Sequence, residues 1–119
     1  MPSAATVTAA QNFEAAKAGP LGVRQEAVAA AQRTYRVARQ AELTTWEHAH
    51  AAVQKRFDLL KSDPEHPDLP AATRALNELQ QPSPRRLLAE MDRAIQQADR
   101  EYHETLQRLR AEHGLTRAF

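Results

Sequence analysis

The sequence from residue 88 to residue 109, LAEMDRAIQQADREYHETLQRL, decides the fold. Side chains at alternating steps of three and four form a stripe through it: Leu88, Met91, Ile95, Ala98, Tyr102, Thr105 and Leu109. An average step of 3.5 residues is typical of helices that wind against a partner helix. The stretch therefore predicts a long amphipathic helix whose apolar side contacts another helix. Ala98 and Thr105 are smaller than the large apolar residues expected at such positions.

A second stripe with the same spacing occupies residues 46–60. Its members are Trp46, His50, Val53, Phe57 and Leu60. Because no Gly or Pro occurs from residue 23 to residue 62, we predict one helical rod on the order of 60 Å long. Tyr35, which belongs to an upstream stripe, lies 11 residues before Trp46, a step that one continuous stripe accommodates. The alternative is that Tyr35 and Trp46 face different neighbours.

Glycine and proline divide the rest of the chain. A short helix is predicted over residues 8–18, capped by Thr8, and Gly19-Pro20-Leu21-Gly22 is the expected hinge. The prolines from Pro64 to Pro70 reverse the chain. A helix over residues 71–81 follows, with Leu69, Ala72, Leu76 and Leu79 along one face. Pro84 then opens the last helix, which Gly114 ends.

These elements predict an all-α fold. Its core is a long, coiled-coil-like antiparallel helical hairpin of residues 23–62 against 84–113, with one short helix at the turn and another at the N-terminus. The expected organisation is a tail, short helix and hinge in residues 1–22, the hairpin domain in residues 23–113, and a tail in residues 114–119. The longer helix would outrun its partner by roughly 15 Å. Residues 23–35 would then need cover from the N-terminal helix or from another chain.

Composition points to assembly. Only six residues are aromatic, and much of the 42% apolar fraction is alanine, which buries little area. We therefore expect a homo-oligomer or a complex with other helical proteins. Phe13 and Phe119 lie outside both stripes and are expected to dock into a neighbouring subunit. The predicted interface comprises Tyr35, Trp46, Val53, Phe57, Leu60, Leu88, Met91, Ile95, Tyr102, Leu109 and Phe119.

Charge and the length of apolar runs limit the partners and the cellular location that we expect. The formal net charge is +1, so there is no bulk attraction to nucleic acid or to anionic membranes. No apolar run is long enough to span a bilayer, and the N-terminus lacks the pattern of a cleavable signal peptide. The chain has no cysteine. We expect a protein of the cytoplasm, or one incorporated in a virion or secretion apparatus.

Catalytic chemistry has little support in the sequence. Neither a thiol nucleophile nor a phosphate-binding glycine loop is present, so we expect no enzyme and no cofactor. The best metal candidates are Glu47 and His50, three residues apart on one helical face, as in the Glu-x-x-His pairs of ferritin-like di-iron bundles. Only one such pair occurs. The favoured interpretation is that His50 is a polar member of the stripe that sets helix register.

Arginines suggest an alternative function. Arg86, Arg93 and Arg100 are spaced by seven residues and line one edge of the last helix. Ser83-Pro84-Arg85-Arg86 resembles the short minor-groove element of some histones. Asp and Glu residues are interspersed with these arginines, which weakens the field that a phosphate backbone would meet. The sequence thus favours a non-enzymatic structural, assembly or adaptor protein of a bacterial or phage complex, with nucleic-acid binding as the alternative.

Overall fold

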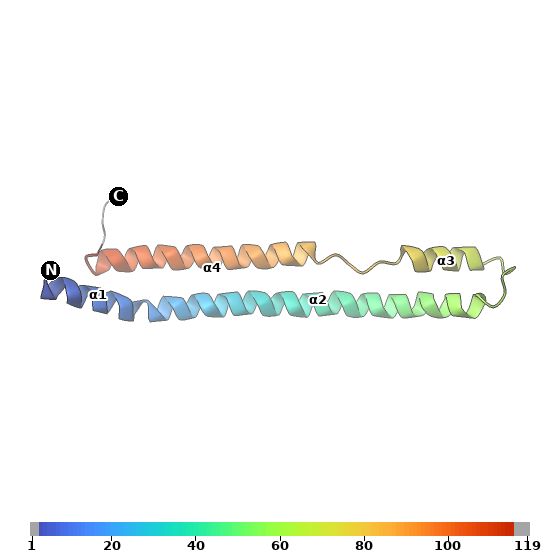
Figure 1. The fold of residues 1–119 in the computed structure, drawn as a ribbon, viewed down its shortest axis with the longest axis horizontal. Coiled ribbons are helices and arrows are strands. Elements are labelled where there is room, and N and C mark those ends of the chain that lie inside the picture. Colours follow the sequence, from blue (N-terminus) through green and yellow to red (C-terminus); the bar gives the residue numbers. More distant parts are fainter. Residues whose placement is uncertain (1–2, 116–119) are drawn as a thin grey trace. The chain divides into compact units, whose positions relative to one another are not determined.

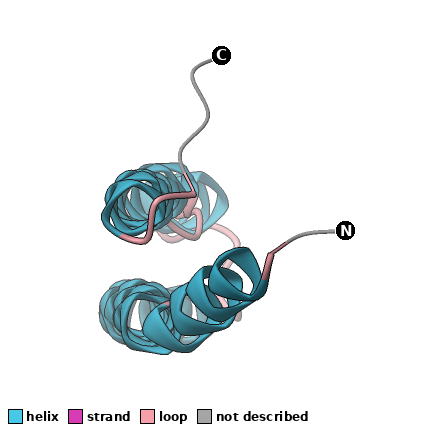
Figure 2. Ribbon diagram, turned by 90° about the vertical axis from the view of Figure 1, so that its left-hand side faces the viewer, coloured by secondary structure: helices cyan, strands magenta, loops and turns pink. Residues whose placement is uncertain are grey.

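The computed structural model describes residues 3–115, and all regular structure in that range is helical (Figures 1 and 2). The predicted all-α hairpin, with a short N-terminal helix and a short helix after the turn, is confirmed. No helix in the described range is long and apolar enough to cross a membrane. The four helices are α1 (Ala4–Ala16), α2 (Ala18–Leu60), α3 (Leu69–Glu78) and α4 (Arg85–Glu112).

The first helix begins and ends earlier than the sequence predicts. Its N-cap is Ser3, whose Oγ accepts a hydrogen bond from the backbone N–H of Thr6 at 3.2 Å, so Thr8 lies inside the helix. The interruption falls at Lys17 and not at the Gly-Pro-Leu-Gly segment, which forms the start of α2. Pro20 explains this position: without an N–H it cannot donate to the carbonyl four residues earlier, yet it fits the first turn of a new helix.

Proline also sets the turn between α2 and α3. After α2 ends at Leu60, the backbone N–H of Asp63 donates to the carbonyl of Leu60 at 3.0 Å. The next residue, Pro64, cannot continue a helix. Pro70 occupies the first turn of α3, where its fixed φ is favourable. This helix covers residues 69–78, about two residues earlier than predicted.

The last helix has a well-defined C-terminal cap. Gly114 adopts a φ of +68°, in the left-handed region that glycine enters without a steric penalty. The N–H of Leu115 donates to the carbonyl of Arg110 at 2.8 Å, and that of Gly114 donates to Ala111 at 3.1 Å. This pair of bonds is a Schellman motif. The predicted stop at Gly114 is thereby explained.

The chain divides into two compact units that share α2. The first contains the described parts of residues 1–34 and 88–119. Within it, α1 and the first part of α2 lie antiparallel to α4 (Figure 1). The order of the contacts shows the direction, because Phe13 lies beside His113 while Arg24 bonds to Asp99.

The second unit contains residues 35–87. Here the remainder of α2 groups with α3 and with the non-helical segment that follows α3. A guanidinium N–H of Arg39 donates to the backbone carbonyl of Pro82. Arg86 lies 4.0 Å from Glu42. Leu69 and Leu76 of α3 and its C-cap residue Leu79 are half-buried and Ala72 is buried, which agrees with the face predicted for that helix.

The pairing of the long helices differs in register from the sequence expectation. The stripe in residues 46–60 and the stripe in α4 belong to different units. Residues 23–34, which were expected to need cover from elsewhere, are the part of α2 that shares a unit with α4. Two stripes of equal period can pair at several registers, each one heptad apart. The period predicted that the helices pair, and the structure shows where.

Candidate interaction surface

The apolar side of α4 follows the predicted heptad spacing with one change at its start. Met91, Ile95, Tyr102 and Leu109 are half-buried as the stripe predicts. Leu88, however, is 38% exposed, while Leu87 is only 7% exposed and takes the first covered position. The predicted member Leu88 is therefore displaced by its neighbour. The step from Leu87 to Met91 is four residues, which is equally compatible with one helical face.

The stripe on α2 is continuous. Partly covered positions within α2 include Tyr35, Trp46, Val53, Phe57 and Leu60. Ala38 and Glu42 are also half-buried and fill the interval between Tyr35 and Trp46 by steps of three, four and four. This interval is the 11-residue step that a nearly straight helix accommodates without losing its face. The favoured expectation of one continuous stripe agrees with this burial.

Few side chains in the described range are buried. In residues 3–115 the buried set is Phe13, Ala31, Ala72, Leu87 and Ala98. Three of these five are alanines. The large residues of both stripes keep part of their surface in contact with solvent. The helices of this chain therefore cover the apolar stripes only in part. Each unit consequently presents apolar area that another helix could cover.

Phe13 is not the exposed anchor that the sequence suggested. Its ring is 6% exposed and lies in the first unit. Lys17 Nζ is 5.1 Å and the Arg110 guanidinium carbon 5.7 Å from the ring centroid, and His113 approaches edge-on at 6.4 Å. The Arg110 and His113 contacts connect α1 to the end of α4 through cation–π and ring interactions, while Lys17 is the C-cap residue of α1 itself. Phe119, the other aromatic residue expected to dock, lies outside the described residues.

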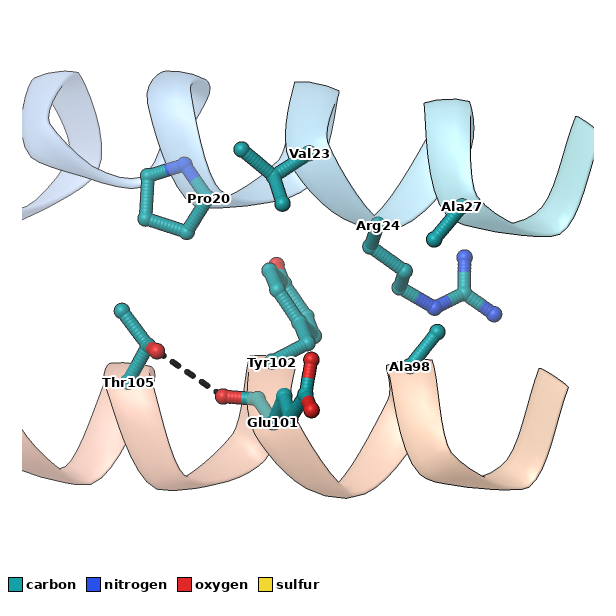
Figure 3. Close-up of a pocket in the computed structure, with 8 residues that line it drawn as sticks. All are labelled: Pro20, Val23, Arg24, Ala27, Ala98, Glu101, Tyr102 and Thr105. Carbon is teal, nitrogen blue, oxygen red and sulfur yellow. Dashed lines mark hydrogen bonds between the residues drawn. The ribbon is translucent and has the colours of Figure 1, made fainter. Parts of the chain in front are cut away.

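A groove lies between the first part of α2 and α4, in the first unit (Figure 3). We call it the α2–α4 groove; its volume is about 380 Å³. Its residues come from α2 (Pro20, Val23, Arg24 and Ala27) and from α4 (Ala98, Glu101, Tyr102 and Thr105).

The groove has a simple origin in the sequence. Ala98 and Thr105 are the two positions of the α4 stripe that are too small for a filled seam, and both line the groove. On α2, Ala27 lies across from Ala98 in Figure 3, so two small side chains face each other at this end of the groove. The small size of Ala98 and Thr105 was the feature of the sequence that could have indicated a groove here. The groove residues Pro20 and Val23 lie outside the predicted stripes, so they were not predicted from the sequence as part of this site.

Three polar side chains around the groove form hydrogen bonds within the chain. The hydroxyl of Thr105 donates to the backbone carbonyl of Glu101 at 2.8 Å, as Figure 3 shows. The carboxylate of Glu101 accepts a bond from Gln97 at 2.9 Å. Arg24 donates to Asp99. The groove thus offers mainly alkyl and aromatic surface to an incoming group.

The metal candidates do not converge on a site. His50 stacks on Trp46, with ring centroids 4.9 Å apart and an interplanar angle of 25°. Glu47 is exposed. Within residues 3–115, no group of three His, Cys, Asp or Glu side chains is placed to hold a metal ion. The position of His50 fits the expected role of a polar stripe residue.

The arginine edge is exposed. Arg85, Arg86, Arg93 and Arg100 all have exposed side chains. Arg100 donates to Gln97 on the preceding turn, and Arg86 lies near Glu42. The structure thus leaves this edge accessible, and nucleic-acid binding stays a prediction.

Comparison with protein-family models, with curated proteins and with solved structures finds no match.

Proposed function

We propose that this protein is a non-enzymatic structural or assembly protein that acts through helix–helix contacts, as a subunit of a larger bacterial or phage assembly. The observation that carries the proposal is the burial pattern. In the described range only two side chains larger than alanine, Phe13 and Leu87, are buried. Trp46, Phe57 and Ile95 stay half-covered, although large apolar residues in a heptad stripe are normally enclosed by a partner.

The chemistry of the surface supports the same proposal. The α2–α4 groove is open, and its residues Arg24, Glu101 and Thr105 form hydrogen bonds within the chain. A binding site for a small molecule normally combines an enclosed apolar pocket with a few convergent polar groups. The groove offers apolar contact area instead, which suits the side of another helix.

Mass and thermal unfolding at two concentrations test the proposal. Sedimentation equilibrium at about 2 and 200 µM should give a mass above the 13.3 kDa of one chain. The unfolding midpoint should rise with protein concentration, because association stabilises the folded state by mass action. A 13.3 kDa species that unfolds cooperatively at one midpoint over this range would refute the proposal, since it would be self-sufficient as a monomer.

A mobility-shift assay separates this proposal from the nucleic-acid alternative. We expect no retardation of duplex DNA at about 150 mM salt, because acidic residues accompany the arginine edge. A salt-dependent shift that is lost when Arg86, Arg93 and Arg100 are all replaced by Ala would favour the alternative.

A further inference from the structure

A histidine ring nitrogen closes the turn between α2 and α3. The backbone N–H of Asp68 donates to Nδ1 of His66 at 3.0 Å. The main chain of His66 also bonds on both sides: its N–H donates to the carbonyl of Asp63 at 3.0 Å, and its carbonyl accepts from the N–H of Leu69 at 3.1 Å. His66 therefore joins the first part of the turn to the start of α3, and its side chain supplies one of the bonds.

The bond from Asp68 determines which nitrogen of the ring carries a proton. A backbone N–H is always the donor, so Nδ1 of His66 must be the acceptor and carries no proton. The neutral ring then has its proton on Nε2. Uptake of a second proton makes both ring nitrogens donors. The bond from Asp68 and the protonated ring therefore exclude each other.

The start of α3 depends on this bond because the N-cap side chain does not contribute one. Asp68 is the N-cap residue, and its carboxylate makes no capping hydrogen bond. N–H groups at the start of a helix need partners from outside the helix, and side chains commonly supply them. Here the ring of His66 serves the N–H of the N-cap residue itself.

Neighbouring charges do not hold the ring in one protonation state. The charged side chains of the turn and of the adjoining ends of α2 and α3 are Asp58, Lys61, Asp63, Glu65, Asp68 and Arg74. In the described part of the chain none of them forms an ion pair with the ring of His66. Lys61 bonds to Asp58 at 3.2 Å, and the Asp63 carboxylate accepts the N–H of Glu65 at 3.3 Å. The carboxylates of the turn adjoin His66 in the sequence whether the turn is open or closed, so they attract a proton to the ring in both states.

We infer that His66 makes the turn between α2 and α3 sensitive to pH. Histidine side chains ordinarily take up their second proton near pH 6.5. The closed turn requires an unprotonated Nδ1, so a falling pH favours the open turn by linkage. The bond to Asp68 is present above this range and is lost as the pH falls through it, which releases the start of α3. The inference concerns the second unit alone and does not depend on the proposed function.

His103 on α4 provides a matched control in the same chain. Its Nδ1 lies 2.7 Å from the backbone carbonyl oxygen of Asp99. A carbonyl oxygen only accepts, so this Nδ1 carries the proton and the second proton goes to Nε2. Protonation leaves the bond of His103 in place. The two neutral rings should thus be opposite tautomers, and only His66 should lose its bond at low pH.

NMR spectroscopy of the full chain tests both steps. At about pH 7.5 the ring-nitrogen chemical shifts should show the Nε2–H tautomer for His66 and the Nδ1–H tautomer for His103. The protection of the Asp68 amide is its solvent-exchange rate relative to the random-coil rate at the same pH. Between about pH 7.5 and about pH 5.5 this protection should fall about fivefold, the factor that one typical net hydrogen bond contributes. A local measurement is needed because the chain has five histidines.

Two substitutions separate the hydrogen bond from the titration. His66→Asn supplies a side-chain oxygen that can accept the N–H two residues later and does not titrate. In this variant the Asp68 amide should keep its protection at both pH values. His66→Ala removes the acceptor, so the protection should be low at both.

Loss of protection at low pH in the wild type, with constant protection in His66→Asn, supports the inference. An Nδ1–H tautomer of His66 at about pH 7.5 would overturn it, because that nitrogen could not accept. Unchanged protection in the wild type would also overturn it. So would an equal loss in His66→Asn, because another titrating group would then be responsible. The wild-type tautomer and titration decide the inference by themselves if the asparagine side chain does not form the bond.

Discussion

Two glycine substitutions should have opposite effects on stability, because the structure gives the two glycines opposite roles. Gly22 lies inside α2, and a Cβ placed there meets no atom within 4 Å. Alanine in a helix interior is more favourable than glycine by about 1 kcal/mol. Gly22→Ala should therefore raise the free energy of unfolding by about that amount.

At Gly114 the sign reverses. The space around its Cβ position is also open, but its φ is +68°. An L-residue in the left-handed region costs roughly 1–2 kcal/mol. Gly114→Ala should therefore lower the free energy of unfolding by about 1 kcal/mol, although it adds the same methyl group.

Urea denaturation followed by far-UV circular dichroism at one fixed protein concentration measures both effects. The midpoints of the two variants should move to opposite sides of the wild-type midpoint. Destabilisation by Gly22→Ala would refute the reasoning, because it would show that residues 19–22 form the flexible break and not the start of α2. Equal shifts for both variants would refute the role of the positive φ at Gly114.

Two further predictions concern α1 and the exposed side of α2. Phe13→Ala should cost about 3 kcal/mol or more, as for a buried aromatic residue, and should speed proteolysis within α1; unchanged proteolysis would show that Phe13 does not hold α1 to α4. Hydrogen bonds from Gln54 and then Lys61 lower the pKa of Asp58 from its ordinary value of 3.8, so this favourable interaction is present above pH 3.8 and is lost as the pH falls through the lowered pKa. Gln54→Ala should raise the pKa of Asp58 measured by NMR titration of the carboxyl carbon, and Lys61→Ala should raise it as well; an unchanged pKa in Gln54→Ala would refute the role of that hydrogen bond.

Local features of the fold were predictable because they depend on nearby residues. Pro64 and Pro70 cannot sit in a helix interior, so the break after α2 and the start of α3 follow from their positions. The same holds for the end of α4 at Gly114. The covered face of α3 was also predictable, since its spacing at Leu69 and Ala72 repeats the helical period.

The candidate site was predictable only in part. The sequence singled out Ala98 and Thr105 as too small for a filled stripe, and both line the groove. Val23 could not be predicted as a groove residue, because it lies outside the stripes. Whether it lines a groove depends on which segment of α4 lies opposite. Phe13 was wrongly predicted to dock into a neighbouring subunit for a similar reason. Its burial depends on contacts with Arg110 and His113, nearly a hundred residues later in the chain.

The sequence by itself determined that this chain is helical, near which residues its helices are interrupted, and which side of α2, α3 and α4 is apolar, because propensity, proline geometry and period act over a few residues. Only the tertiary structure decided which stretches pair. It grouped residues 23–34 with α4 and residues 46–60 with α3. Stripes of equal period fit one another at every heptad shift, so the choice of register depends on contacts between distant residues, such as Arg24 with Asp99. That register placed Ala27 opposite Ala98 and so created the groove.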